Sequence, residues 1–279
     1  MLIEVNGINL HVEIEGQGAP LLLLHGFTGS TKSWQWILPL LRHRYQLIVI
    51  DLIGHGQSDA PVDFNRYSMD CAVRDLLSVL DYLKLQQINL LGYSMGGRCA
   101  LHFAAQAPER VQSLILESSS PGIENEAERQ ARKKADETLA EFIEERGLEL
   151  FVNQWSKLDL FATQQLLPQK IQNEIRTQRL QNRPQGLANS LRGMGTGVQQ
   201  SLWNSLHQIH TPTLLLAGKE DAKFRQIAFS MQEKLPKAAL RIIAEAGHAI
   251  HLEKPVQFAN AVENFLENVY ENHIKNERN

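Results

Sequence analysis

The 279-residue sequence predicts an α/β protein with a mostly parallel, eight-stranded sheet flanked by helices. Short apolar runs alternate with longer helical patterns, as they do in proteins whose sheet is covered by helices on both faces. Six of these runs are almost continuous in apolar residues, which is typical of strands buried on both faces. One long segment breaks the alternation, and we interpret it as an inserted helical cap.

The first strands form a hairpin. Residues Leu2–Val5 and Asn9–Ile14 alternate between apolar and polar, and Asn6-Gly7 lies between them. An Asn-Gly pair in this setting is a strong hairpin signal, because both residues tolerate positive φ. The six apolar runs that we assign to buried strands are Pro20–Leu24, Gln46–Ile50, Ile88–Leu91, Ser113–Leu116, Thr213–Ala217 and Leu240–Ile243.

Helical periodicity occupies the intervals between these strands. The expected helices are Ser33–His43, Met69–Leu83, Met95–Gln106, Phe224–Leu235 and Pro255–Tyr270. The last begins with a proline, which suits the first turn of a helix. We expect the polar tail 271–279 to fray.

Residues 121–210 contain no strand pattern and predict several helices. We therefore divide the chain into a core of residues 1–120 and 211–279 and a cap of residues 121–210. Within Lys170–Gln200 the cap carries five basic residues and one acid, a local charge of +4. A charge run is usually a solvated face, but this one is expected to overhang the active site, so a role in binding an anion stays open.

Composition limits the class of protein. The chain has 28 Lys and Arg against 31 Asp and Glu, a net charge of −3, which argues against a nucleic-acid partner. No stretch reaches the ~18 apolar residues of a membrane span, and the N-terminus has no basic region before Lys32. Cys71 and Cys99 are too few for a disulfide framework. We expect a cytoplasmic protein, monomeric or a small homo-oligomer.

The strongest chemical signal is the segment Gly92-Tyr93-Ser94-Met95-Gly96. It has the form G-x-S-x-G and lies between a predicted buried strand and a predicted helix, which is the setting this motif requires. The sharp reversal forces strained dihedrals on Ser94, and glycines are needed where a Cβ would collide with backbone. Ser94 is therefore the candidate nucleophile or base, at a helix N-terminus that favours negative charge.

A second loop supports this assignment. After the strand Pro20–Leu24 the chain continues as HGFTGS, residues 25–30. A glycine-containing loop here can direct a backbone N–H toward the serine, so Phe27 and Met95 are expected to supply an oxyanion hole. Asp51 and His55 follow the next strand, and we expect them to brace loops rather than to act in catalysis.

A serine needs a base and an acid that orients the base. In this architecture the chain order is serine, acid, histidine. Asp221 follows the strand Thr213–Ala217, and His248 follows the strand Leu240–Ile243, so both lie at the edge that carries Ser94. We expect Asp221 to orient His248, which relays a proton. Glu220 stays open as the rival acid and His251 as the rival histidine. No metal-ligand pattern is present, and no cofactor is expected.

The nested motifs HGFTGS, DLIGHGQSD, GYSMGG, GKED and AGH resemble the α/β-hydrolase fold along nearly the whole chain. Finer features resemble the menaquinone-pathway family of 2-succinyl-6-hydroxy-2,4-cyclohexadiene-1-carboxylate synthase (MenH). They are GYSMGGR at residues 92–98, the opening of the cap with Arg132 and Asp136, and the later cap with Trp155, Phe161 and Arg179. That family is a lyase on a hydrolase scaffold, and it eliminates pyruvate from 2-succinyl-5-enolpyruvyl-6-hydroxy-3-cyclohexene-1-carboxylate.

The resemblance implies a catalytic triad of Ser94, Asp221 and His248. It implies substrate contacts at Tyr93 and Arg98 by direct motif match, and at Arg132, Trp155 and Arg179 by a match in the cap, where spacing varies. The implied partner is a small-molecule polycarboxylate, which suits arginine's planar, two-pronged recognition of carboxylates. Fold alone does not settle function. A serine hydrolase, an esterase or carbon–carbon bond hydrolase for a small carboxylate-bearing substrate, remains the alternative, and a non-catalytic interaction role is a third.

Overall fold

The computed structural model describes residues 1–277 of the chain. It contains one eight-stranded sheet in the order β1-β2-β4-β3-β5-β6-β7-β8. The first two pairings are antiparallel and the other five are parallel. All eight strands lie where the sequence predicts them, most of them a residue or two longer: β1 Leu2–Val5, β2 Ile8–Glu15, β3 Ala19–Leu24, β4 Tyr45–Ile50, β5 Ile88–Tyr93, β6 Val111–Glu117, β7 Thr213–Gly218 and β8 Ala238–Ile243.

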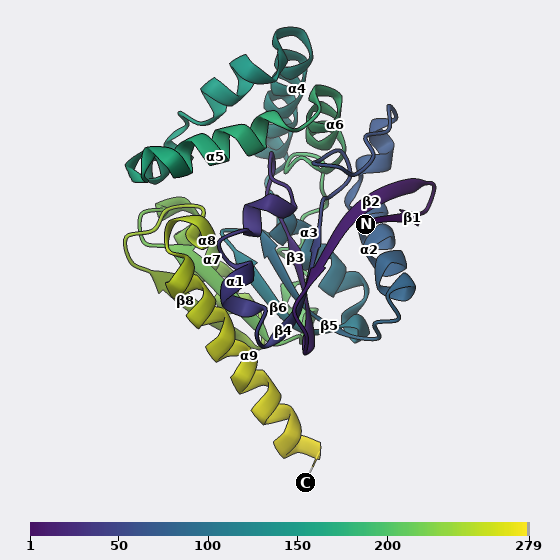
Figure 1. Cartoon of the computed structure of the whole chain (residues 1–279), viewed down its shortest axis with the longest axis vertical. Coiled ribbons are helices and arrows are strands. Elements are labelled where there is room, and N and C mark those ends of the chain that lie inside the picture. Colours follow the sequence, from purple (N-terminus) through teal and green to yellow (C-terminus); the bar gives the residue numbers. More distant parts are fainter. Residues whose placement is uncertain (278–279) are drawn as a thin grey trace.

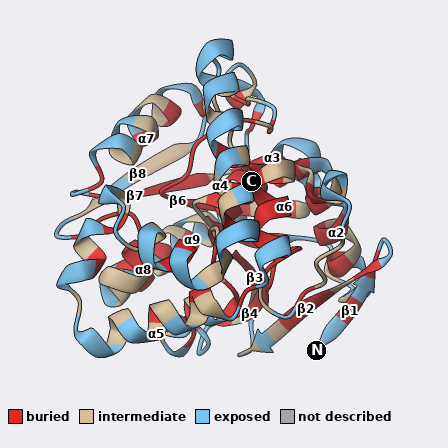
Figure 2. Cartoon of the chain, turned by 90° about the horizontal axis from the view of Figure 1, so that it is seen from above, coloured by how far each residue is buried: buried red, intermediate tan, exposed pale blue. Residues whose placement is uncertain are grey.

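Alternate residues of the central strands divide between two apolar cores, because successive side chains of a strand point to opposite faces. Leu22 and Leu24 belong to the core with helices α2 (Met69–Tyr82), α3 (Met95–Gln106) and α7 (Ala222–Lys234). Leu21 and Leu23 belong to the core with α1 (Leu38–Leu41), α8 (Ile250–Glu253) and α9 (Pro255–Glu277). The sheet is thus covered on both faces, and buried residues concentrate on its strands while the helices expose their outer sides (Figure 2).

Two expected helices are wrong in their limits. The single helix Ser33–His43 is instead a 3-10 turn, Thr31–Trp34, followed by the short helix α1. Pro39 explains the break, because it lacks the N–H that a continuous helix would need there. The last helix does not end at Tyr270 but continues to Glu277 and projects from the body of the molecule (Figure 1). Residues 278 and 279 of the tail that we expected to fray lie outside the described residues.

Residues 118–212 form no strand. They contain α4 (Glu126–Trp155), a 3-10 segment (Asp159–Leu166), α5 (Gln169–Leu180), α6 (Pro184–Met194) and a 3-10 turn (Leu206–Gln208). Helix α4 bends at Gly147, whose φ of 78° and ψ of 168° interrupt the helical backbone. The helices α4 and α6 share a separate small apolar core around Ile143 and Leu187. Together with α5 they lie above one end of the sheet (Figure 1).

Candidate active site

Ser94 lies at the tight turn between β5 and α3. Its φ of 51° and ψ of −107° are strained for a residue with a side chain. A Cβ on Gly92 would lie 2.4 Å from the carbonyl oxygen of Gly96, and one on Gly96 would lie 2.2 Å from that of Leu24. Both glycines are therefore required by backbone contact, and the turn leaves the Ser94 hydroxyl clear of the sheet.

The structure brings Ser94, His248 and Asp221 together from three separate loops. The His248 Nε2 lies 3.0 Å from the Ser94 Oγ, and the His248 Nδ1 lies 2.7 Å from the Asp221 Oδ2. Both distances are those of hydrogen bonds, and the shorter one suits a carboxylate acceptor. The arrangement can take a proton from the serine and hold the resulting imidazolium beside a carboxylate.

Each partner in this set is held by its own surroundings. The second oxygen of Asp221 accepts the Phe224 N–H at 3.2 Å as the N-cap of α7, which restrains the carboxylate. Glu253 accepts the Gly247 N–H at 2.6 Å and the Ala249 N–H at 3.3 Å, so the peptide groups on both sides of His248 are held. His248 itself is 1% exposed.

Glu220, the alternative acid, and His251, the alternative histidine, lie outside this hydrogen-bonded set. Glu220 is exposed, whereas the adjacent Asp221 is buried against His248. His251 is buried and its Nδ1 lies 2.8 Å from the carboxylate of Glu117, with no contact to Ser94. The geometry therefore favours Asp221 and His248 over Glu220 and His251.

The loop after β3 runs directly beside Ser94. A Cβ on Gly26 would lie 3.4 Å from the Ser94 Cβ, so the Gly26–Phe27 backbone passes close to the serine. Neither the Phe27 N–H nor the Met95 N–H has a backbone acceptor among the described residues. His25 fixes the loop: its Nδ1 donates to the Gly26 carbonyl at 2.8 Å, and its Nε2 accepts the Leu52 N–H at 3.0 Å. Burial lowers the pKa of His25 to about 4, which keeps it neutral.

Asp51 and His55 lie beneath this loop and not at the serine. Asp51 is 1% exposed, and its carboxylate accepts the N–H groups of Thr31 and Gln57, the latter at 2.8 Å. The His55 ring packs 5.9 Å from the Phe27 ring, measured between centroids, and burial lowers its pKa to about 3. Both residues thus brace loops on which the site depends.

A cavity of about 640 Å³ opens over Ser94 between the core and the cap. Its size is in the range of pockets that hold a small-molecule ligand. Eight of the sequence-predicted site residues besides Ser94 line it: Phe27, Tyr93, Met95, Arg98, Arg132, Trp155, Asp221 and His248.

Two arginines in the cavity wall differ in their partners. Arg98, one turn into α3, is 9% exposed and donates to the Met194 carbonyl at 2.7 Å. Burial and the nearby Arg132 lower the pKa of Arg98 to about 10. Arg132 is more exposed and pairs with Asp136 at 2.8 Å. A core arginine and a cap arginine therefore line one cavity, and of the two only Arg132 has a carboxylate as a direct partner.

Tyr93 and Trp155 supply aromatic surface to the same cavity. The Tyr93 ring lies 5.4 Å from that of His248 between centroids, and burial raises the pKa of its phenol well above the usual value. Trp155 packs 5.4 Å from Phe27, and its buried indole N–H has no acceptor among the described residues. Trp155 therefore contributes ring surface to the cavity, and its indole N–H is buried.

Arg179 does not line this cavity. Its guanidinium lies 4.8 Å from the centroid of the Phe161 ring, which does line the cavity. It borders instead a small adjoining space of about 50 Å³, shared with Phe27 and His251, and a separate groove of about 580 Å³, shared with Ser156 and Gln164. Its predicted contact with substrate therefore stays a prediction.

Sequence reasoning missed several residues of the wall. Phe224 packs 4.5 Å from His248 between ring centroids, and Leu160, Thr196 and Ile227 also line the cavity. Phe224 and Ile227 could have been inferred, because they lie on the helix that Asp221 caps. Leu160 and Thr196 come from irregular cap segments whose path no local pattern specifies.

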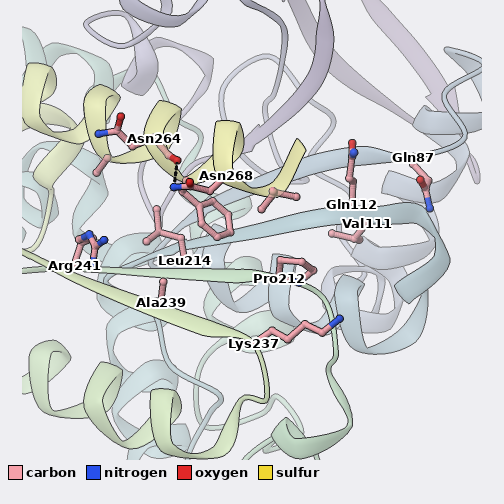
Figure 3. Close-up of a pocket in the computed structure, with 13 residues that line it drawn as sticks. Gln87, Val111, Gln112, Pro212, Leu214, Lys237, Ala239, Arg241, Asn264 and Asn268 are labelled. Atoms are coloured by element: carbon pink, nitrogen blue, oxygen red, sulfur yellow. Dashed lines mark hydrogen bonds between the residues drawn. The ribbon is translucent and has the colours of Figure 1, made fainter. Parts of the chain in front are cut away.

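A larger groove of about 760 Å³ lies away from Ser94, between α9 and the strands β6 to β8 (Figure 3). Its 13 lining residues include no serine, cysteine, histidine or acid. Its only charged side chains are Lys237 and Arg241, with no acid or histidine as a catalytic partner, so size alone does not make it the candidate active site.

Within residues 1–277 no three His, Cys, Asp or Glu side chains come together as a metal-binding group. No helix in that range is long and apolar enough to cross a membrane.

The fold and the serine turn define a class of protein. The chain belongs to the α/β-hydrolase fold family, whose model matches residues 19–255. It is 44% identical, over 95% of its length and 97% of the relative's, to a Bacillus subtilis (strain 168) protein named "Putative 2-succinyl-6-hydroxy-2,4-cyclohexadiene-1-carboxylate synthase".

Solved structures agree with this family. The structure of MenH from S. aureus is 39% identical, with a TM-score of 0.90, and the match covers 93% of this chain and 99% of that one. A thermophilic esterase from Thermogutta terrifontis, solved with malate bound, is 25% identical with a TM-score of 0.86, over 96% of this chain and 99% of that one. Lyases and esterases thus share this architecture.

Proposed function

We propose that this protein is a 2-succinyl-6-hydroxy-2,4-cyclohexadiene-1-carboxylate synthase of menaquinone biosynthesis. It eliminates pyruvate from 2-succinyl-5-enolpyruvyl-6-hydroxy-3-cyclohexene-1-carboxylate. The observation that carries the proposal is one cavity in which Ser94, His248 and Asp221 face the buried Arg98. The names of the similar Bacillus subtilis and S. aureus proteins support it.

The proposed reaction begins with loss of the proton on the carbon α to the succinyl carbonyl. Ser94, deprotonated through His248, is the base, and Asp221 stabilises the imidazolium. The resulting enolate oxygen accepts the N–H groups of Phe27 and Met95. One such donor is worth about 2.7–4 kcal/mol in the transition state.

Elimination then follows without another reactant. The enolate electrons shift through the ring, and the bond between the ring carbon and the enolpyruvyl oxygen breaks. The leaving enolate of pyruvate takes the proton held on His248 and becomes pyruvate. The proton count closes, because the substrate proton restores the Ser94 hydroxyl and the proton that His248 took from Ser94 goes to the leaving enolate.

The substrate carries three carboxylates, and arginines are suited to them. Arg98 and Arg132 line the cavity and are assigned two of these groups. Tyr93 and the Trp155 ring, which also line the cavity, are assigned contacts with the remainder of the ligand. Arg179 can contact the ligand only if the Phe161 side chain moves or the small adjoining space widens. Of the proposed substrate-binding residues, Arg179 therefore has the least structural support.

The division into core and cap is part of the same proposal. Residues 1–120 and 211–279 form the α/β core, and residues 121–210 form the cap. The separate apolar cluster around Ile143 and Leu187 supports this division. The position of the cavity over Ser94 supports a cap that covers the site.

We place the reaction in the cytoplasm. The two cysteines support this, because Cys71 and Cys99 are free thiols. Burial raises the pKa of Cys99 to about 12, so it is an inert core residue and not a reactive one.

The deciding experiment mixes the protein with the enolpyruvyl substrate and follows pyruvate by a coupled assay. We expect release well above the spontaneous rate, and near-complete loss in Ser94→Ala and His248→Ala with unchanged thermal melting. A rate equal to the spontaneous one would reject the synthase.

A serine hydrolase is the second candidate, and the likeness to a malate-bound esterase favours testing it. It predicts turnover of aryl esters and a covalent acyl group on Ser94. Efficient ester hydrolysis that is insensitive to Arg98→Ala would favour this candidate over the synthase.

A further inference from the structure

Several cap arginines near the surface pair with acids. Arg132 pairs with Asp136 at 2.8 Å, and Arg176 pairs with Glu149 at 3.0 Å. Arg192 pairs with Glu144 at 2.7 Å. The two buried arginines, Arg98 and Arg179, have no acid within ion-pair distance among the described residues.

Arg98 has only neutral partners. Its Nη1 donates to the Met194 carbonyl and to the Oε1 of Gln199, and no carboxylate lies within 4.0 Å of it in the described chain. Asp136 is the acid whose charge acts on the pKa of Arg98; its Oδ1 accepts from Arg132, and its buried Oδ2 has no hydrogen-bond partner among the described residues. Gln199 is 3% exposed, and its own Nε2 has no partner in that part of the chain.

Arg179, which lies behind Phe161 and outside the cavity over Ser94, also has only neutral partners. Its Nη2 donates to the Oε1 of Gln164 at 3.2 Å and its Nη1 to the Ser156 hydroxyl at 2.7 Å. No acid is within ion-pair distance of it among residues 1–277. Arg179 is 8% exposed and Gln164 is 7% exposed, so both arginine–glutamine pairs are buried.

A buried cation without a counter-ion is costly, and burial lowers the pKa of both arginines to about 10. A glutamate in the place of either glutamine would relieve that cost by forming an ion pair. It would also cancel the charge that attracts an anion. An amide orients the guanidinium through a hydrogen bond and leaves its charge available. On Arg98 the Nη2 and Nε, which make no hydrogen bond to the described residues, remain for a two-pronged carboxylate.

We propose that Gln199 and Gln164 are positioning residues that determine specificity for a polyanionic ligand by holding Arg98 and Arg179 with neutral amides. The identity of that ligand rests on the proposed function. The arrangement itself requires only that the ligand carry carboxylates.

The experiment compares two isosteric changes at one position. Gln199→Glu adds a charge that pairs with Arg98, and Gln199→Met removes the acceptor without adding charge. We expect Gln199→Glu to raise KM for the enolpyruvyl substrate about 10- to 100-fold, with kcat changed by less than about threefold. We expect Gln199→Met to raise KM only a few-fold. Gln164→Glu and Gln164→Met form a second pair at Arg179.

Gln185→Glu is the matched control, because it places the same charge on an exposed glutamine of the cap helix α6. It should leave KM unchanged. Binding of succinate, a small dicarboxylate, is measured by calorimetry on the same proteins, and the wild-type affinity should fall by the same factor in Gln199→Glu. This readout separates the inference from the proposed function, since it needs no turnover.

Equal effects of the glutamate and methionine changes would indicate a purely structural role and overturn the proposal. So would a KM for Gln199→Glu within twofold of wild type, or a wild-type protein that does not bind succinate. Thermal melting checks folding. If Gln199→Glu does not fold, the Gln164 pair decides by the same comparison.

Discussion

Asp221→Asn tests the assignment of the orienting acid. In the wild-type structure the Asp221 Oδ2 accepts the His248 Nδ1–H at 2.7 Å, and the opposite nitrogen faces Ser94 at 3.0 Å. An amide at residue 221 can present its N–H₂ to the imidazole. The histidine then carries its proton on Nε2, where it cannot accept one from the serine.

The expected loss is large in rate and small in stability. The lost charge-assisted bond and the wrong tautomer together lower kcat by about 10²- to 10⁴-fold, or about 2.7–5.4 kcal/mol. Asp221 also caps α7 through the Phe224 N–H, but asparagine caps a helix about as well as aspartate. The free energy of unfolding therefore changes by less than about 1 kcal/mol.

Pyruvate release under substrate saturation measures the rate, and urea unfolding measures the stability. The neighbouring Glu220→Gln is the matched control, because it makes the same chemical change on an exposed side chain. It should keep kcat within about twofold. The reasoning is refuted if Asp221→Asn keeps kcat within about threefold, or if Glu220→Gln is equally severe.

Three further predictions concern the ligand, the turn and pH. Arg98→Lys should raise KM about 10- to 100-fold, because an ammonium cannot replace the planar fork; a wild-type KM would contradict this. Gly92→Ala should destabilise by about 3 kcal/mol or more in urea unfolding, since its Cβ would lie 2.4 Å from the Gly96 carbonyl. Gly7→Asn should cost less, because its Cβ would meet nothing within 4 Å and asparagine tolerates the φ of 81° better than most side chains. Burial lowers the pKa of His25, His55 and His102 to about 4, 3 and 4, respectively. As the pH falls below 6.5, these histidines therefore bind protons in the unfolded chain before they do so in the folded protein. Stability present at pH 7 should fall by up to about 2 kcal/mol for each by pH 5, and a flat profile would reject this for His25, His55 and His102.

Much of the site could be read from local sequence. Gly92, Ser94 and Gly96 specify the turn, because backbone contact there permits only glycine at two positions. Asp221 and His248 follow predicted strands, and parallel strands deliver their C-terminal loops to one edge of the sheet. Strand periodicity also located all eight strands, since each buried run is a local pattern.

Other parts could not be read in this way. The break at Pro39 and the extension of α9 to Glu277 changed two helix limits. The sequence contained Gln199 and Gln164, but nothing in their neighbours indicated that each would meet a buried arginine. Such contacts join residues 101 and 15 positions apart, and no local periodicity records them.

The sequence by itself determined the class of fold, the serine turn, and the candidates for acid and base, because each depends on short-range patterns of apolar, glycine and polar residues. Only the tertiary structure decided between Asp221 and Glu220 and between His248 and His251. Those choices depend on which side chain is buried within hydrogen-bond distance of its partner. The structure alone also showed Arg98 open to the cavity and Arg179 behind Phe161, because packing of the cap against the core sets which charges face a ligand.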